Sequence, residues 1–205
     1  MGDAAKRPTN RLQPKAAPVI RSRIDDMVVT ETERLVVRRL TTHDALFVLS
    51  LVNDPDWLRY IGNKGVHTLD DARDYIAGGP MQSYAEHDFG QYLVELKNEA
   101  IPIGLCGLKK RDGLDHPDLG FAFLPAYRGL GYAHEACNGI MTQLQEKFGY
   151  IHLLAITSLD NFRSIRLLEK LGMRLDRLIT LPGANHQVRL YQVVLESDIA
   201  TPRDE

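Results

Sequence analysis

The sequence reads Arg128-Gly129-Leu130-Gly131-Tyr132-Ala133 between an apolar run, 119–124, and a segment with helical periodicity, 132–148. This order predicts a strand, a glycine turn and the start of a helix. The first N–H groups of a helix have no carbonyl partner within it, and the helix dipole places partial positive charge there. Glycines let the backbone approach a diphosphate closely, and Arg128 can add charge. The stretch therefore predicts a site for a ligand that carries a pyrophosphate.

Two common nucleotide motifs do not match this stretch. The chain contains no Gly-x-x-x-x-Gly-Lys-Ser/Thr string, so a P-loop is excluded. A dinucleotide fingerprint requires a third glycine where this chain has His134. The pattern that fits is Arg/Gln-x-x-Gly-x-Gly/Ala, with Arg128, Gly131 and Ala133, and it resembles the acetyl-coenzyme A motif of the GNAT acetyltransferase superfamily. Taken alone, the string also fits an ordinary helix start after a tight turn.

Three further segments carry the same resemblance in the same order along the chain. Thr32–Arg38 and Asp118–Leu124 resemble two strands of the ribosomal-protein N-acetyltransferase branch, the RimJ/RimL-like group. Asn161–Ser164, followed by 167–173, resembles the superfamily's Asn-x-x-Ala/Ser helix, which ends in Glu-Lys-x-Gly-Phe/Met. The resemblance covers about residues 30–195.

The order of apolar segments predicts an α+β domain with a mixed sheet, because antiparallel strands come first and a strand-helix-strand crossover follows. Strands are expected at 35–38, 91–97, 101–108, 118–124, 151–157, 173–180 and 188–195, and helices at 42–52, 56–60, 68–77, 132–148 and 161–171. Residues 81–85 are a further candidate for a helix. The sequence Gly78-Gly79-Pro80 is expected to end the helix that starts at Thr68. The resemblance implies the GNAT fold: a mostly antiparallel sheet of six to seven strands, splayed at its centre, with helices on both faces.

The resemblance implies acetyl-CoA as the cofactor and indicates the residues that would hold it. The backbone N–H groups that would hold its pyrophosphate are those of Arg128, Gly129, Leu130, Gly131, Tyr132 and Ala133. The backbone of Phe123 and Leu124 would pair with the pantetheine arm as an added strand, and one of their N–H groups would face the oxyanion. Asn161 would bind a pantetheine amide, cap its own helix, or do both.

Asp118 and Ser164 are the candidate catalytic residues. Asp118 aligns with an acid of the resembling branch, and a carboxylate beside an apolar cleft can have a raised pKa and act as a base through a water. Its other interpretation is a solvated acid at the end of a loop. Many superfamily members place a tyrosine where this chain has Leu168, so Ser164 is the candidate to contact the coenzyme sulfur and hydrogen-bond the leaving thiolate. Its other interpretation is a small residue needed for packing.

The acceptor pocket of the resembling branch would lie around Trp57, Tyr60 and the loop 62–68. By the same topology, Asp54, Trp57, His87 and Asp88 are candidates to meet an amine.

Composition excludes several other classes. The chain has 205 residues and a net charge of −2, which suits one domain and gives no reason to expect nucleic-acid binding. No apolar run is long enough to cross a bilayer. The two cysteines, Cys106 and Cys137, lie in strand and helix patterns and are expected to be buried free thiols rather than a disulfide. No Cys or His cluster has zinc spacing, so no metal site is expected.

The ends of the chain differ from its centre. Residues 1–27 are proline-containing and basic, and we expect a disordered arm there, with the acetyltransferase domain at 28–197 and a polar tail at 198–205. The arm has no apolar core of a secretory signal, so a cytoplasmic location is expected, and its basic composition also leaves a mitochondrial presequence open.

The sequence thus predicts an acetyl-CoA-dependent N-acetyltransferase that transfers the acetyl group directly to a primary amine in a ternary complex. The acceptor would be a protein N-terminus or a small amine, and the chain would be a monomer or homodimer without nucleic-acid or membrane partners. Two alternatives stay open: a catalytically weak coenzyme-binding sensor or scaffold, and a nucleotide-binding oxidoreductase.

Overall fold

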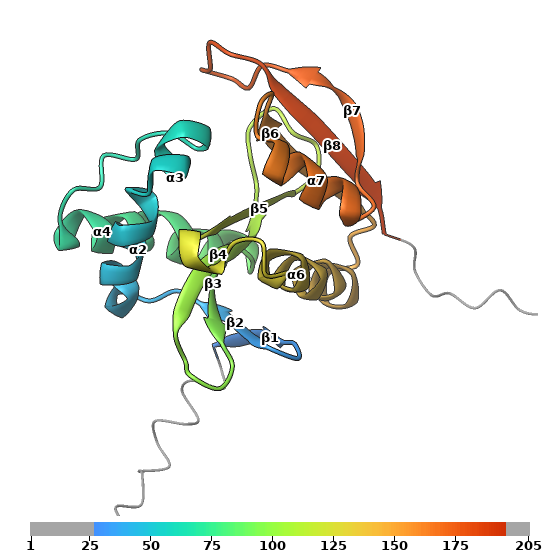
Figure 1. Cartoon of the computed structure of the whole chain (residues 1–205). Coiled ribbons are helices and arrows are strands. Elements are labelled where there is room, and N and C mark those ends of the chain that lie inside the picture. The colour runs from blue at the N-terminus through green and yellow to red at the C-terminus, as the bar shows by residue number, and fades with distance from the viewer. Residues whose placement is uncertain (1–26, 196–205) are drawn as a thin grey trace, which may run out of the picture.

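The computed structural model describes residues 27–195, which form one eight-stranded sheet with helices on both faces (Figure 1). The strands are β1 (Val28–Glu31), β2 (Leu35–Arg39), β3 (Gln91–Leu96), β4 (Pro102–Lys109), β5 (Asp118–Phe123), β6 (His152–Ser158), β7 (Arg174–Ile179) and β8 (Val188–Val194). Their order in the sheet is β1-β2-β3-β4-β5-β6-β8-β7, and β5 and β6 form the parallel pair. The predicted α+β fold with a mostly antiparallel sheet is confirmed.

The sheet has one strand more than the largest predicted number. The added strand is β1, which pairs with β2 and lies directly after the basic segment that the sequence analysis assigned to a disordered arm. The predicted arm, apart from Met27, and the predicted polar tail lie outside the described residues. Across residues 27–195, no helix has the length and apolar character needed to cross a membrane.

The helices are α2 (Ala45–Val52), α3 (Pro55–Tyr60), α4 (Leu69–Ile76), α5 (Gln82–His87), α6 (Tyr132–Phe148) and α7 (Phe162–Lys170). A capping box of Thr68 and Asp71 starts α4, as its sequence predicts. Asp54 caps α3, because its carboxylate accepts from the N–H groups of Asp56 and Trp57. A turn of 3₁₀ helix, Thr42–Asp44, precedes α2.

The predicted helix end at Gly78–Pro80 is wrong. The chain instead forms a single wide π turn, Ala77–Met81, that joins α4 directly to α5. A proline cannot donate the usual helical hydrogen bond, and its ring clashes with the carbonyl four residues earlier. A π turn changes this spacing locally and so lets a buried Pro80 stay inside a continuous helical segment.

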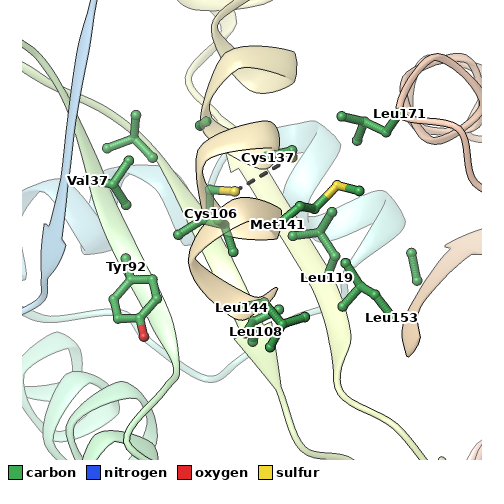
Figure 2. Packing of buried hydrophobic residues seen from close by; sticks show 14 of the residues in the cluster. Val37, Tyr92, Cys106, Leu108, Leu119, Cys137, Met141, Leu144, Leu153 and Leu171 are labelled. Carbon is green, nitrogen blue, oxygen red and sulfur yellow. Dashed lines mark hydrogen bonds between the residues drawn. The ribbon is translucent and has the colours of Figure 1, made fainter. Parts of the chain in front are cut away.

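The larger part of the core lies between the sheet and helices α6 and α7. The buried face of α6 presents Cys137, Met141 and Leu144 to strand residues that include Leu108 and Leu119 (Figure 2). The positions on α6 follow helical spacing, so one side of a 17-residue helix covers the middle of the sheet. Because α6 is fixed along its length, its first turn has a fixed position relative to the end of β5.

A second core covers the opposite face of the sheet and involves α2, α3 and α4. Val48, Leu51, Trp57 and Ile76 pack there on Leu105 of β4. Side chains alternate between the two faces along β5, since Leu119 and Phe123 belong to the first core and Ala122 packs on the second. Asp118, which is four residues before Ala122, is therefore on the face of α2 to α4.

Candidate active site

The divergence of β5 and β6 creates the first element of the site. Within the described residues, these parallel strands pair at one position, where Asp118 faces Leu154. The N–H of Leu154 donates to the Pro117 carbonyl oxygen at 3.0 Å beside that pair. β6 pairs with β8 along its whole length, from His152 to Ser158. The facing edges of β5 and β6 thus separate beyond the pair and leave backbone groups without a neighbouring strand.

The glycine turn follows the diverging end of β5. Gly129 and Gly131 have φ angles of +75° and +86°, a conformation that glycine adopts readily. Gly131 precedes α6, and no side chain caps this helix. The N–H of Glu135 donates to the Gly131 carbonyl oxygen at 3.1 Å, as the first turn of α6 closes. The earlier N–H groups of the helix start are therefore available to an anion at the positive end of the helix dipole.

Arg34 is the cation that lies against this turn. A Cβ atom added at Gly131 would lie 3.2 Å from Arg34 Nη2. Arg34 Nη1 donates to the Leu130 carbonyl oxygen at 3.1 Å, and Arg34 Nε donates to the Glu135 carboxylate at 2.7 Å. Arg34 and Gly131 line a groove of about 490 Å³, which also has His134, Asn138 and Lys170 in its wall. Sequence reasoning did not find Arg34, because no local motif joins it to a turn 96 residues later.

The side chain of Arg128 is directed elsewhere. Its Nε donates to the Phe123 carbonyl oxygen at 2.7 Å. Its Nη1 and Nη2 each lie 2.5 Å from a carboxylate oxygen, of Asp56 and Asp54 respectively. The guanidinium thus joins the end of β5 to the start of α3. Arg128 contributes its backbone to the turn, but its charge is already paired with two aspartates.

The structure distinguishes Phe123 from Leu124 at the cleft. The N–H of Leu124 donates to the Ile103 carbonyl oxygen at 2.9 Å, and its own carbonyl accepts from Tyr127 N–H at 3.0 Å. Because alternate residues of an antiparallel strand bond to the same neighbour, the backbone groups of Phe123 point away from β4 and toward the gap. The Phe123 ring is buried on Gly104, where a Cβ atom would come within 2.5 Å of the ring. Phe123 can therefore be a core residue and still offer its N–H to a ligand.

Asp118 lies at the paired end of the cleft and is buried, with an exposed fraction of 1%. Arg111 Nε donates to both of its carboxylate oxygens, at 2.8 and 3.0 Å. Burial raises the pKa of Asp118 above the usual range of aspartate, while Arg111 opposes this effect. Asp118 is therefore not the solvated loop residue of the second interpretation. As a base it would share its carboxylate with Arg111.

Asn161 and Ser164 lie together at the start of α7. The Asn161 side chain caps the helix by accepting from the Ser164 N–H at 3.2 Å. The capping interpretation of Asn161 is therefore what the structure shows, and its amide nitrogen is still able to donate. Ser164 is half-buried, and its hydroxyl makes no hydrogen bond to the residues that the structure describes, 27–195. Leu168, at the position of the missing tyrosine, is buried in the core.

The four candidates for meeting an amine do not form one group. Asp54 and Trp57 lie together on α3 and its cap. Asp88 instead pairs with Arg39 at 2.6 Å and with Lys147 at 2.9 Å, near the C-terminal end of α6. His87 adjoins Asp88, so both are separated from α3. Among buried side-chain nitrogens and oxygens in the described part of the chain, Trp57 Nε1 is the one that lacks a hydrogen-bond partner.

Comparison with known proteins now decides the family. Residues 34–174 match the family model described as acetyltransferase (GNAT) domain, which is more than half of the chain. This chain belongs to the GNAT acetyltransferase family. Membership confirms the acetyltransferase predicted from the glycine turn and identifies acetyl-CoA as the acetyl donor.

Similar proteins agree with this membership. The chain is 29% identical over 143 residues to the uncharacterized N-acetyltransferase YnaD of Bacillus subtilis (strain 168), covering 70% of this chain and 81% of YnaD. An acetyltransferase (GNAT family) from Bacillus anthracis shares 25% identity and a TM-score of 0.68, over 82% of this chain and 98% of that structure. RimL, the ribosomal L7/L12 alpha-N-protein acetyltransferase solved with coenzyme A, shares the fold at 15% identity and a TM-score of 0.70, over 82% of this chain and 98% of that structure.

The turn of this GNAT acetyltransferase fits the diphosphate of the coenzyme. The helix start has no side-chain cap. Gly131, which has a positive φ, carries no side chain, so the space beside Arg34 is open. An anion placed there would meet backbone N–H groups and the guanidinium of Arg34, whose Nε and Nη2 also bind the Glu135 carboxylate at 2.7 Å. The diverging edge of β5 provides the backbone N–H of Phe123 for an extended, amide-containing arm.

Proposed function

We propose that this acetyltransferase transfers the acetyl group of acetyl-CoA directly to a primary amine, in a ternary complex. The observation that carries the proposal is the single β5–β6 pair at Asp118 and Leu154, after which the strands diverge toward the glycine turn. This geometry supports an extended ligand that enters between the strands, with its diphosphate at the turn. An acceptor would then approach from the face of α3 and α4.

The bound coenzyme would supply an activated thioester. The chain's own part is to bind and orient it: the N–H groups from Gly129 to Ala133 would hold the diphosphate, and Phe123 N–H would face the gap. Asn161 would add its side-chain amide at the start of α7. Ser164 would direct its hydroxyl toward the coenzyme sulfur as a hydrogen-bond donor.

The cysteines support direct transfer. The chain has two, and both Cys106 and Cys137 are fully buried, with their Sγ atoms 3.6 Å apart (Figure 2). Burial raises the pKa of the Cys137 thiol well above its usual range, which suppresses the nucleophilic thiolate. A cysteine that carries the acetyl group between donor and acceptor therefore has no support in this chain.

We further propose Asp118 as the base that accepts the ammonium proton, through a water. Its position on the face of α2 to α4 and its raised pKa support this role. Arg111 would have to release one of the two carboxylate oxygens that it binds. The acceptor is an amine of a protein N-terminus or a small molecule, in line with the RimL-like resemblance in sequence.

The test is an initial-rate study with acetyl-CoA and a panel of N-terminal peptides, polyamines and amino sugars, with thiol release as the signal. We expect intersecting rate patterns and, by mass spectrometry, no acetylated enzyme when acetyl-CoA is present alone. Parallel rate patterns together with an acetyl-enzyme would refute direct transfer. Tight coenzyme binding without turnover of any amine would favour the alternative, a coenzyme-binding sensor, for which the missing tyrosine at Leu168 is the specific observation.

A further inference from the structure

Arg128 joins the glycine turn and the end of β5 to a helix that lies much earlier in the sequence. Its guanidinium contacts the Phe123 carbonyl at the end of β5, and Asp54 and Asp56 at the start of α3, 74 and 72 residues earlier. Its backbone begins the coenzyme turn. A movement of the turn that displaces Arg128 would therefore also change the contacts of α3, on the acceptor side of the sheet.

Asp54 is the buried end of this connection. Its side chain has an exposed fraction of 8%, and in the described part of the chain it is one of three buried polar or charged residues, with Asp118 and Thr157. Its Oδ1 accepts from Arg128 Nη2 and also from the N–H groups of Asp56, at 3.1 Å, and Trp57, at 3.4 Å. One carboxylate oxygen thus caps the start of α3 and also accepts from the guanidinium of Arg128.

Asp56 makes a similar contact in a different environment. It pairs with Arg128 Nη1 at 2.5 Å and with Arg163 of α7 at 3.3 Å, but its side chain is 41% exposed. Exposed ion pairs contribute little, because water and salt screen them. Asp56 is therefore a matched control for Asp54, because both lie at the start of α3 and both pair with Arg128.

Helix α3 depends on such contacts for its position. A helix of six residues is too short to be stable by itself, so its neighbours fix where it lies. It also carries Trp57, whose buried Nε1 has no hydrogen-bond partner in the described residues. A buried donor without a partner indicates that the local arrangement is not fully satisfied, and a shift of α3 or a bound group could supply an acceptor.

We propose that Asp54 is a positioning residue that couples the coenzyme turn to the acceptor-side helix α3 through Arg128. The proposal rests on the proposed function, in which the turn holds the diphosphate. When the coenzyme fixes the turn, Arg128 is fixed with it, and the charged hydrogen bond to Asp54 holds α3. Coenzyme binding thereby orders the acceptor side before an amine arrives, which is a coupling between two sites.

The experiment measures hydrogen exchange of peptides that cover α3, with and without saturating coenzyme A, in the full chain. For the wild type we expect coenzyme A to raise the protection of the α3 amides about tenfold, a typical size for coupling between sites. In Asp54→Asn the coenzyme should still bind, with affinity within about threefold, but this gain should vanish. Asparagine caps a helix about as well as aspartate, so the variant removes the charged contact and keeps the cap.

Asp56→Asn should keep the gain, as the control. If Asp54→Asn does not fold, Arg128→Lys replaces it, at a coenzyme A concentration raised until it saturates this variant, because one ammonium cannot reach all three acceptors of the guanidinium. A purely structural role of Asp54 would lower α3 protection equally with and without coenzyme A, and that result would overturn the proposal. If Asp54→Asn and Asp56→Asn both lost the increase in α3 protection that coenzyme A causes, the proposal would also be overturned. A wild-type chain that bound no coenzyme A would refute the proposed function itself, whereas normal binding without any α3 response would refute this inference alone.

Discussion

Replacement of Gly131 by alanine separates the two roles of the glycine turn, folding and ligand binding. Gly131 has a φ of +86° and Gly129 a φ of +75°, so an alanine at either position adopts a backbone conformation that side chains disfavour. Their surroundings differ. The added Cβ at Gly131 would lie 3.2 Å from Arg34 Nη2, whereas at Gly129 no atom lies within 4 Å. Gly129→Ala is therefore the matched control for Gly131→Ala.

The conformational cost should be similar in both variants. A left-handed backbone costs a residue with a Cβ about 1–2 kcal/mol. For a domain of this size, each kcal/mol lowers the melting temperature by about 2–4 °C, so we expect a decrease of about 2–8 °C for each variant. At Gly131 alone, the methyl group would displace Arg34 or the anion beside it. A lost charge-assisted hydrogen bond is worth about 1.5–3 kcal/mol, which corresponds to a decrease in coenzyme affinity of about 10- to 150-fold.

The assay is calorimetric titration with coenzyme A, together with thermal unfolding of the wild type and both variants. We expect equal melting temperatures within a few degrees and a much larger Kd for Gly131→Ala than for Gly129→Ala. Arg34→Ala should reproduce most of the affinity loss without the conformational cost. Equal affinities in the two glycine variants would show that the space beside Arg34 is not where the coenzyme binds.

Three further predictions concern ionisable groups that are buried or partly buried. Cys106 and Cys137 should not react with an aromatic disulfide reagent in the native state and should both react in denaturant; reaction of the folded chain would contradict their burial. Burial lowers the pKa of Lys109 to about 8, so the unfolded chain binds the extra proton between pH 8 and 10.5 and stability rises with pH there. In urea unfolding at pH 7 and pH 10, the free energy of unfolding of the wild type should rise between the two pH values, and that of Lys109→Met should not. An equal rise in both proteins would refute this prediction. Asp118→Asn should lower kcat at least about 100-fold and remove the acidic limb of the pH–rate profile, since a base with a raised pKa loses activity when protonated; the same limb in both forms would exclude this role.

Local patterns in the sequence were sufficient for most of the elements and for the turn, but not for β1. The helix 132–148 and the strand before it follow from periodicity, and the glycines between them mark the turn that we propose as the anion site, because these signals depend only on neighbouring residues. The wide turn at Pro80 did not follow from the same rules. Proline usually ends a helix. The tertiary packing that keeps the helical segment continuous through Pro80 cannot be inferred from the residues next to it in sequence.

Side-chain partners across the molecule could not be predicted from the sequence. Arg128 was assigned to the phosphate because it stands in the motif, yet its guanidinium binds Asp54 and Asp56, which lie in another part of the chain. Arg34 lies where that charge was expected, although nothing in its own segment indicates a ligand. The hydrogen bond from Arg111 to the buried Asp118 also depends on a loop whose course no local pattern specifies.

These two arginines restrict the turn in part before a coenzyme arrives. Arg34 binds the Leu130 carbonyl from the side of β2, and Arg128 anchors the first residue of the turn to α3. A glycine-containing turn loses much conformational entropy when it becomes fixed, and a ligand that had to fix it would bind more weakly by that amount. Here Arg34 and Arg128 restrict the turn from both sides, so less of the free energy of coenzyme binding is spent on the ordering that remains. Arg34→Ala and Arg128→Lys should therefore each weaken coenzyme A binding through the order of the turn, and increased hydrogen exchange of the 128–133 amides in the ligand-free variants is the observation that this argument requires.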